Sequence, residues 1–563
     1  MIRIVNKIFE FLCDELPEDL NVKKEYEIPK SEFGDLAFPC FSLAKKFRKN
    51  HVIIAAELSE KLNEKLSDFG SFSGNGGYLN FRFSDDFLAR GILSELMERK
   101  EKFGWEENTG KTVIIDFSSP NIAKPFSIGH LRSTSIGNAL RKILIANGMN
   151  VIGVNHLGDW GTQFGKLIYA YRKWGNESIF NEKGVDYLLE LYVKFHNEAE
   201  KDPSLDEFGR EEFKKLEHGD TENRKLWEKF RDISLDEFKK IYERLGIEFD
   251  HFTGESFYED KLEDTIKRLF DKGLLEKSEG AEIVNLNDQG MPPALIRKND
   301  GSTLYLTRDL AAAIYRKEVL KADLLLYVVG SEQKLHFNQL KAVVKKLGYD
   351  WYENIHHIDF GLFRFSGEKM STRKGKIIFM KDVLDEAKNT ILNIIKEKNP
   401  ELYEKERIAE EVGAGAIIFG DLVNERIKNI TFSWEKMLQF EGDTGPYVQY
   451  AHARCKSILR KSGFSENEKF NIPEKISEYE RELLREIMIY SVKINKVSNS
   501  YKPHYIAESL LKITKSFNRF YQNCPVINAK NDLKDFRLMI VFLTATILKS
   551  GMSLLGMRAP DEM

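Results

Sequence analysis

One stretch in the first third of the chain limits the folds that this sequence can adopt. Residues 112–117 form an apolar, β-branched run, which predicts a buried strand of a parallel sheet. From residue 136 to residue 144 apolar side chains recur at helical spacing, and Gly148 stands where a helix would end. The stretch therefore predicts a strand, a loop and a helix, with the loop at the carboxyl end of the strand.

This loop ends in Ser127-Ile128-Gly129-His130. Free backbone N–H groups and the helix macrodipole suit a phosphate at such a position. Gly129 allows a ligand to approach the backbone, and His130 is able to donate to a phosphate oxygen. We therefore assign Ser127, Gly129 and His130 to ATP binding. The alternative is that Ser127 only caps the helix and that His130 is only a first-turn residue.

A second segment with nucleotide-binding character begins 239 residues after His130. Residues 369–376, KMSTRKGK, contain four cations and lie in a glycine-flanked stretch that predicts a loop. Such a loop is able to close over a triphosphate and to neutralise charge as pyrophosphate leaves. Lys369, Met370 and Ser371 are therefore assigned to ATP, with His130 and Lys369 as catalytic groups. The alternative is a solvated basic loop.

The two segments belong to a set of five motifs, which occur in the order SSPNIAKPFSIGHLRST, NHLGDWGTQFG, YLTRD, KMSTRKG and DTGPYVQYAHAR. Together they resemble the arginyl-tRNA synthetases, a family of class I aminoacyl-tRNA synthetases, and the resemblance extends from the N-terminal region to Met563. Two positions depart from the family pattern. Ser127 stands in place of the first His of the four-residue signature, and Thr372 stands in place of the second Lys of the downstream loop.

The length of 563 residues predicts several domains. The resemblance implies an α/β fold with a Rossmann-like class I catalytic domain at residues 111–400. A charged helical insertion at about 173–246 splits this domain. A small α/β domain that binds the tRNA elbow is expected at residues 1–110, and an all-helical anticodon-binding domain is expected at residues 401–563.

The distribution of charge agrees with this arrangement. The net charge is −3, but residues 441–563 contain 19 Lys and Arg against 14 Asp and Glu, a charge of +5 that leaves −8 elsewhere. The basic excess lies where nucleic acid would be held.

The composition argues against three classes of protein. Four cysteines lie far apart without a CxxC pair, so we expect neither a disulfide framework nor a structural metal. No stretch approaches the ~20 apolar residues of a membrane span, and the acidic N-terminus does not resemble a targeting peptide. We expect a cytoplasmic monomer without a membrane contact.

Carboxylates and hydroxyls suit the planar guanidinium of arginine, and such a pocket rejects analogues by roughly 10⁴-fold without an editing domain. Tyr305 and Asp309 are four residues apart, and so share one face of a helix predicted to start near Thr307. Asp309 is alternatively an early helix carboxylate favoured by the macrodipole. With the positions that the resemblance implies, the arginine-binding set is Asp116, Asn121, Glu255, Tyr305, Asp309 and Gln333.

Lys124 and His336 complete the predicted nucleotide site. The resemblance implies that, in members without the second Lys of the downstream loop, a Lys just before the signature contacts ATP phosphate instead. Lys124 holds that position and is assigned a catalytic role, with a surface lysine as the alternative. His336 begins the helix after the apolar run 324–329, near the nucleotide by topology.

Two groups of residues are assigned to tRNA. The resemblance implies that Asn75, Tyr78 and Asn80 touch the tRNA elbow, where an aromatic ring stacks on a base and an amide reads its edge. An edge hairpin with a buried Tyr is the alternative. Tyr447 and Tyr450 interleave with cations and suit stacking on anticodon bases, and Phe517 and Tyr521, one helical turn apart, are a candidate second platform. Core positions are the alternative for these aromatics.

The predicted function is ligation of L-arginine to tRNA-Arg with ATP, supplied as its Mg²⁺ complex. Two other hypotheses stay open at this stage. One is another class I synthetase or a smaller nucleotidyltransferase. The other is a synthetase-like protein that binds tRNA or senses arginine without catalysis, a hypothesis that only Ser127 favours.

Overall fold

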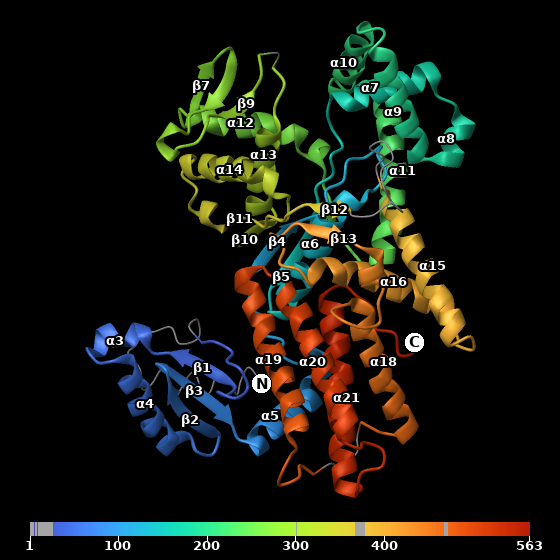
Figure 1. Cartoon of the computed structure of the whole chain (residues 1–563). Helices are drawn as coiled ribbons and strands as arrows, with labels where there is room; N and C mark the ends of the chain where they lie inside the picture. The colour runs from blue at the N-terminus through green and yellow to red at the C-terminus, as the bar shows by residue number, and fades with distance from the viewer. Residues whose placement is uncertain (1–4, 6–7, 9–25, 300, 366–377, 467–470) are drawn as a thin grey trace.

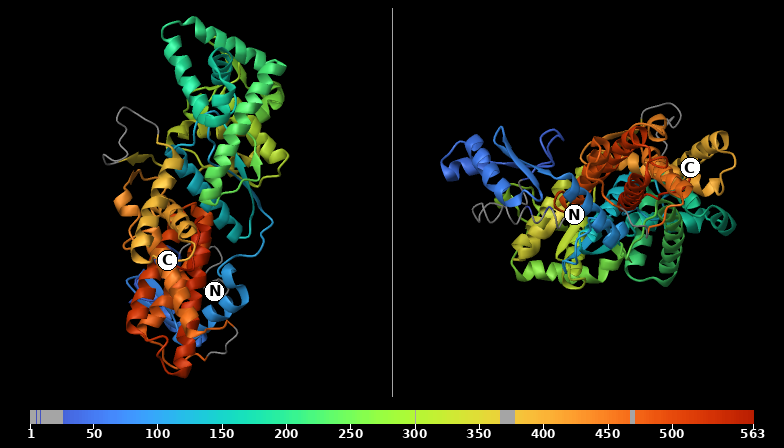
Figure 2. Two further views of the ribbon diagram at one scale, coloured as in Figure 1. Left: turned by 90° about the vertical axis from the view of Figure 1, so that its right-hand side faces the viewer. Right: turned by 90° about the horizontal axis from the view of Figure 1, so that it is seen from below.

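The computed structural model describes residues 5, 8, 26–299, 301–365, 378–466 and 471–563. The molecule is elongated. The helical C-terminal domain lies at one end, beside the small N-terminal domain, and two lobes rise from the catalytic sheet at the other end (Figures 1 and 2).

A five-stranded sheet with the order β11-β10-β4-β5-β6 forms the centre of the catalytic domain, and all of its strand pairs are parallel. The predicted α/β fold with a Rossmann-like core is confirmed. Strand β4 pairs with β5 on one side and with β10 on the other, so the strand order reverses at β4. A ligand crevice is expected outside the carboxyl end of β4, because ligands bind at such a topological switch point. The strands are β4 (Thr112–Asp116), β5 (Asn150–Asn155), β6 (His251–Phe252), β10 (Leu324–Tyr327) and β11 (Ile355–His357).

Helix α6 (Leu131–Ala146) connects β4 to β5 and is buried along most of its length. Gly137 allows it to lie directly on the sheet, because a Cβ at this position would be 2.3 Å from Phe117. Arg132, which is 1% exposed, pairs with buried Asp421 of α16 (Lys405–Leu422) at 2.9 Å. The helix after the predicted phosphate loop is thereby joined to the C-terminal half of the chain.

One lobe carries a small antiparallel sheet and the helix predicted to bind arginine. Helix α13 begins at Tyr305, so the predicted start near Thr307 is wrong by two residues. Thr307 does not cap the helix because its hydroxyl donates to the carbonyl of Ile296 at 2.6 Å. The lobe consists of α12 (Leu262–Asp271), β7 (Leu275–Ser278), β8 (Ala281–Val284), β9 (Ala294–Arg297), α13 (Tyr305–Glu318) and α14 (Lys334–Lys346).

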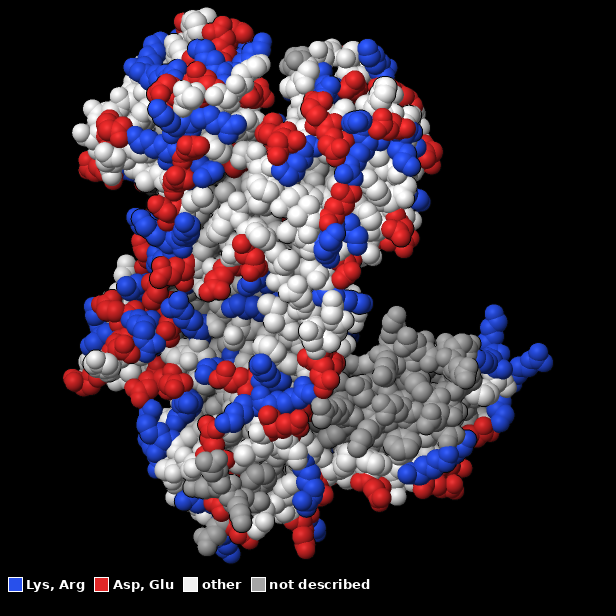
Figure 3. Space-filling model, turned by 180° about the vertical axis from the view of Figure 1, so that it is seen from behind, with Lys and Arg blue, Asp and Glu red and all other residues white. Residues whose placement is uncertain are grey.

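The other lobe is the helical insertion. Trp160, which precedes it, is 4% exposed and packs edge-on against Phe213 and Trp227, so this ring serves packing. The helices are α7 (Thr162–Trp174), α8 (Glu177–Lys183), α9 (Val185–Ala199), α10 (Ser204–Glu217) and α11 (Thr221–Leu245). On the face in Figure 3 a hollow separates the two lobes, and charges of both signs are mixed over them.

The N-terminal domain has an antiparallel sheet with the order β1-β3-β2, covered by helices. Fully buried Asp35 accepts bonds from Arg481 and Arg485 of α19 (Glu478–Ser500), at 2.8 and 3.1 Å. This buried charge network attaches the domain to the helical domain. The elements are β1 (Leu36–Pro39), α3 (Phe41–Phe47), α4 (His51–Leu66), β2 (Gly70–Asn75), β3 (Tyr78–Phe83) and α5 (Asp85–Arg99).

The C-terminal region is helical, apart from β13 (Ile430–Phe432), which pairs in parallel with β12 (Phe363–Phe365). The expectation that no stretch approaches a membrane span is wrong by length and composition, because residues 532–554, within α21, are long and apolar enough to cross a membrane. However, 83% of the most apolar window is buried inside the protein, as in a core helix. The remaining helices are α15 (Met380–Lys398), α17 (Trp434–Met437), α18 (Gly445–Ser462), α19 (Glu478–Ser500), α20 (His504–Asn523) and α21 (Asn531–Leu554).

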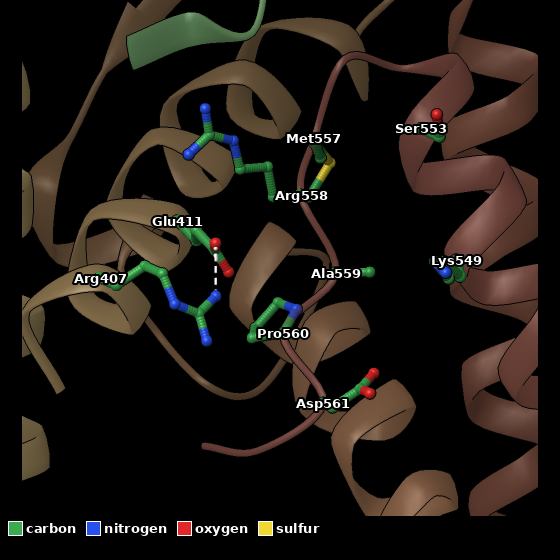
Figure 4. A pocket seen from close by; sticks show the side chains of 9 residues that line it. All are labelled: Arg407, Glu411, Lys549, Ser553, Met557, Arg558, Ala559, Pro560 and Asp561. Carbon is green, nitrogen blue, oxygen red and sulfur yellow. Dashed lines mark hydrogen bonds and ion pairs between the residues drawn. The ribbon is translucent and has the colours of Figure 1, made fainter. Parts of the chain in front are cut away.

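The final segment of the chain packs onto α16, α18 and α21 beside a pocket of about 470 Å³ (Figure 4). Gln449 donates to the carbonyl of Arg558 at 2.9 Å, and His452 bonds Asp561 at 3.2 Å. Two cations at the pocket have acidic partners, since Arg407 pairs with Glu411 and Lys549 pairs with Glu101.

Candidate active site

The loop after β4 has an unusual backbone. Ser118, Ser119 and Ala123 all have positive φ angles, of 74°, 48° and 60°. Non-glycine residues adopt this region at an energetic cost and are found there mainly at functional sites. Two serines hold the loop in place, because Ser133 Oγ accepts from the N–H of Ser118 and Ser234 Oγ accepts from that of Ala123, both at 2.9 Å.

His130 lies at the end of this loop, in the turn Ile128–His130 that leads into α6. The N–H of Ser127 donates to His130 Nδ1 at 3.1 Å, so Nδ1 acts as an acceptor and the proton of the neutral ring is on Nε2. Burial lowers the pKa of His130 below its ordinary value. The backbone beside the exposed Gly129 is open. A neutral N–H donor therefore stands at a helix N-terminus, as a phosphate site requires.

The second predicted ATP segment, with Lys369, Met370 and Ser371, lies outside the described residues. The chain that follows it runs beside the first segment. Ile128 N donates to Ile378 O at 3.0 Å, and Met380 N donates to Phe126 O at 2.8 Å. Two parts of the sequence about 250 residues apart are thus paired next to His130.

Acidic side chains gather at the same end of the sheet. Glu255 follows β6, and its N–H donates to the carbonyl of Leu157, just beyond β5, at 3.0 Å. Its Oε2 is buried and has no hydrogen-bond partner among the residues that the structure describes. Burial, opposed by Arg308 and aided by the nearby carboxylates of Asp309 and Asp159, raises the pKa of Glu255 to about 8.

Asp309 of α13 has different surroundings. His336 Nε2 lies 2.6 Å from Asp309 Oδ2, and His156 Nε2 lies 4.0 Å from Oδ1. Burial opposes ionisation of Asp309, but the bond from His336, with His156 and Arg316 nearby, outweighs it and holds the pKa below its usual value. The ionised carboxylate of Asp309 and the carboxyl of Glu255, which has an unpaired buried oxygen, therefore lie close enough to interact, and a cation bound between them would be stabilised by both.

The other residues predicted to bind arginine are positioned less uniformly. Asn121, Tyr305 and Gln333 are exposed, Tyr305 by 67%. Asp116 is buried, and Arg316 Nη2 lies 2.7 Å from its Oδ2, while Ser119 Oγ donates to its Oδ1. The guanidinium of Arg316 already balances the charge of Asp116. A direct contact between Asp116 and bound arginine stays a prediction, and in it the carboxylate would have to bind Arg316 and the substrate together.

Lys124 is half-buried and faces the insertion, with Nζ 5.1 Å from the centre of the Tyr192 ring on α9. Its predicted contact with ATP stays a prediction, and it requires the ammonium to exchange this cation–π contact for phosphate oxygens. His336, assigned to the nucleotide by topology, instead has its bonded partner in the acidic pocket.

The sequence analysis missed His156, Asp159, Arg308 and Arg316. His156 directly follows β5 and Asp159 comes three residues later, so the rule that ligands bind at the carboxyl ends of parallel strands would have been sufficient to find them. The two arginines gave no such indication, because their role depends on which acids the fold brings to them.

The predicted tRNA residues of the N-terminal domain lie at one hairpin. Asn75 is exposed and pairs with half-buried Tyr78, whose ring packs edge-on against Phe41 at 5.2 Å. Asn80 is only 4% exposed, because β3 is the middle strand of its sheet. Its amide would have to be uncovered before it could read a base edge.

In the helical domain, Tyr450 and Tyr521 are 39% and 42% exposed, and the guanidinium of Arg454 lies 4.8 and 5.9 Å from their ring centres. Tyr447 is half-buried, and its hydroxyl accepts from Asn518 at 2.9 Å. Phe517, considered as part of a second stacking platform with Tyr521, is fully buried and belongs to the core.

A parallel sheet divided by an insertion, with the residues Ser127 to His130 after its central strand, is the arrangement expected of a class I aminoacyl-tRNA synthetase. Comparison with known families agrees. Residues 92–434 match the model described as "tRNA synthetases class I (R), catalytic domain". Residues 448–563 match the DALR anticodon binding domain, and residues 3–83 match the arginyl tRNA synthetase N terminal domain.

Individual relatives are equally specific. An arginine–tRNA ligase of Bacillus cereus is 50% identical over 540 residues, 95% of each chain. The arginyl-tRNA synthetase structure of Thermus thermophilus has a TM-score of 0.82 at 26% identity and covers 96% of both chains. That of Plasmodium falciparum has a TM-score of 0.79 at 26% identity, with 96% and 94% covered. The chain belongs to the arginyl-tRNA synthetase family, and the predicted family and enzyme class are confirmed.

Proposed function

We propose that this protein activates L-arginine with ATP to arginyl-adenylate, releases pyrophosphate, and transfers arginine to the terminal adenosine of tRNA-Arg. The observation that carries the proposal is the placement of Glu255 and Asp309 at the same end of the sheet as the phosphate loop of His130. A guanidinium held between these acids would be close to a nucleotide on that loop.

The arginine carboxylate attacks the α-phosphate in line, and the protein contributes mainly position and charge. The Nε2–H of His130 and the N-terminus of α6 donate to phosphate oxygens, and Lys124 and Lys369 balance the charge that develops as pyrophosphate leaves. Mg²⁺ enters with ATP. The first step requires bound tRNA, which the helical domain holds through Tyr447, Tyr450 and Tyr521.

Consumption of ATP with each amino acid in turn, with and without total tRNA, tests this function. We expect consumption with arginine alone, and only in the presence of tRNA. Consumption with another amino acid would indicate a different synthetase, and none with any amino acid would indicate a binding protein without catalysis.

We also propose that the enzyme is a cytoplasmic monomer without a membrane contact or a structural metal. Sedimentation of the purified protein and elemental analysis for bound metal test the two molecular statements, and cell fractionation tests the location.

Lys124→Ala is expected to lower arginine-dependent turnover at least tenfold, because the variant removes one cation from the transition state. Steady-state kinetics gives the effect, and thermal unfolding checks the fold. Lys194→Ala is the matched control, since Lys194 makes a similar contact with the Trp174 ring at 5.0 Å. Turnover near that of the control would return Lys124 to the role of a surface lysine.

The KM for arginine is expected to fall as the pH rises from about 6.5 to 8.5. Glu255, with its pKa raised to about 8, is mostly protonated at neutral pH and must lose that proton to pair with a guanidinium. Below pH 8 the affinity should therefore rise by up to about tenfold per pH unit. Glu255→Gln should abolish this dependence. Glu263→Gln, at a side chain that is 81% exposed, should retain it.

A further inference from the structure

Behind the arginine pocket, charged and polar side chains from three parts of the sheet form one continuous series. Asp116 at the end of β4 pairs with Arg316 of α13, and Arg316 Nη2 lies 3.5 Å from Nδ1 of His156. The other nitrogen of His156 faces Asp309, which His336 also contacts. Asp309 therefore lies between two imidazoles.

The partners determine which nitrogen of each ring carries a proton. A guanidinium has donors only, so the Nδ1 that faces Arg316 must be the acceptor nitrogen of His156. The proton of His156 is then on Nε2, which lies 4.0 Å from Asp309 Oδ1, so this ring acts on Asp309 through its charge distribution and not through a hydrogen bond. His336 Nε2, at 2.6 Å, must donate to Asp309 Oδ2, because an ionised carboxylate has only acceptors. Both rings are packed, His156 on buried Tyr258 at 5.5 Å and His336 edge-on to Phe337 at 5.3 Å.

We propose that His336 and His156 are positioning residues that orient Asp309 as an ionised carboxylate for a guanidinium, with Arg316 determining the tautomer of His156. The inference rests on the proposed function. Each carboxylate oxygen has two lone-pair sites, so one bond from an imidazole leaves the carboxylate able to accept a bidentate guanidinium. Without these donors a buried carboxyl would take up a proton and would no longer distinguish arginine from its neutral analogue citrulline.

The test compares His336→Leu with His336→Gln, whose side-chain amide replaces the Nε2–H donor. A lost hydrogen bond to a charged group costs about 1.5–3 kcal/mol, which corresponds to roughly 10–100-fold. We expect His336→Leu to raise the KM for arginine by this factor and to leave the KM for ATP and tRNA within about twofold. Inhibition by citrulline should be unchanged, and His336→Gln should restore most of the affinity for arginine. His218→Gln, at an exposed residue of the insertion, is the control.

Several outcomes would overturn the inference. An increase in the KM for ATP with an unchanged KM for arginine would place His336 at the nucleotide. Equal losses in the Leu and Gln variants would indicate a purely structural role. If His336→Leu does not fold, His336→Ala and His336→Gln provide the same comparison. A wild-type protein that does not use arginine would overturn the proposed function as well, whereas wild-type use of arginine with an unchanged KM in the Leu or Ala variant overturns this inference alone.

Discussion

Asp309→Asn is expected to raise the KM for arginine by roughly 10²–10³-fold, because the substitution removes a carboxylate that its neighbours hold ionised while preserving its shape. Asp309→Ala should have an effect at least as large. Both variants should retain their affinity for ATP. Arginine-dependent pyrophosphate exchange in the presence of tRNA measures the change.

Asp264→Asn provides a matched control for this prediction. Asp264 lies on the neighbouring helix α12, is 64% exposed, and pairs with Arg268 away from the pocket. It should leave the KM for arginine unchanged. If Asp309→Asn behaved like this control, the assignment of the guanidinium pocket would be wrong. Glu255 alone would not be sufficient support for that assignment.

His130→Asn is expected to lower kcat for adenylate formation by about 10²–10³-fold, the usual cost of losing one donor to a transition-state oxygen. Asparagine is a selective substitution here, because its side-chain oxygen is able to accept from the N–H of Ser127, as His130 Nδ1 does at 3.1 Å. The local turn should therefore persist while the Nε2–H donor is lost.

Single-turnover measurement of adenylate formation separates this effect from substrate binding. The KM for arginine should change by less than about threefold in His130→Asn, since the guanidinium pocket is built by other residues. His218→Asn controls for a general effect of replacing a histidine. A variant with normal adenylate formation would contradict the role of His130 and leave the helix N-terminus as the only phosphate site.

The core of the fold was predictable because local sequence periods encode it. The apolar run at 112–117 became β4, and the helical spacing at 136–144 lies within α6. Both elements are almost entirely buried, so nearly every residue in them has a side chain that indicates a buried strand or helix. Helix α13 begins two residues before the predicted start near Thr307, and the Thr307 hydroxyl donates to a carbonyl of β9.

The site was predictable only in part. Residue types and spacing identified Asp309 and His130 as groups suited to a guanidinium and a phosphate, and the family resemblance added Glu255. They did not show that His336 bonds Asp309, that Arg316 balances Asp116, or that Asn80 is buried in the middle strand of its sheet. Each of these facts depends on contacts between residues far apart in the sequence, and a motif does not contain them.

The sequence by itself determined the family, the reaction and the order of the elements, because these follow from short segments whose residue types and spacing are specific. The tertiary structure alone decided the protonation and orientation of the charged groups. A buried carboxyl takes its pKa from the donors and charges that the fold places around it. The pKa of Glu255 is therefore raised and the pKa of Asp309 is lowered, although both are carboxylic acids at one end of the same sheet.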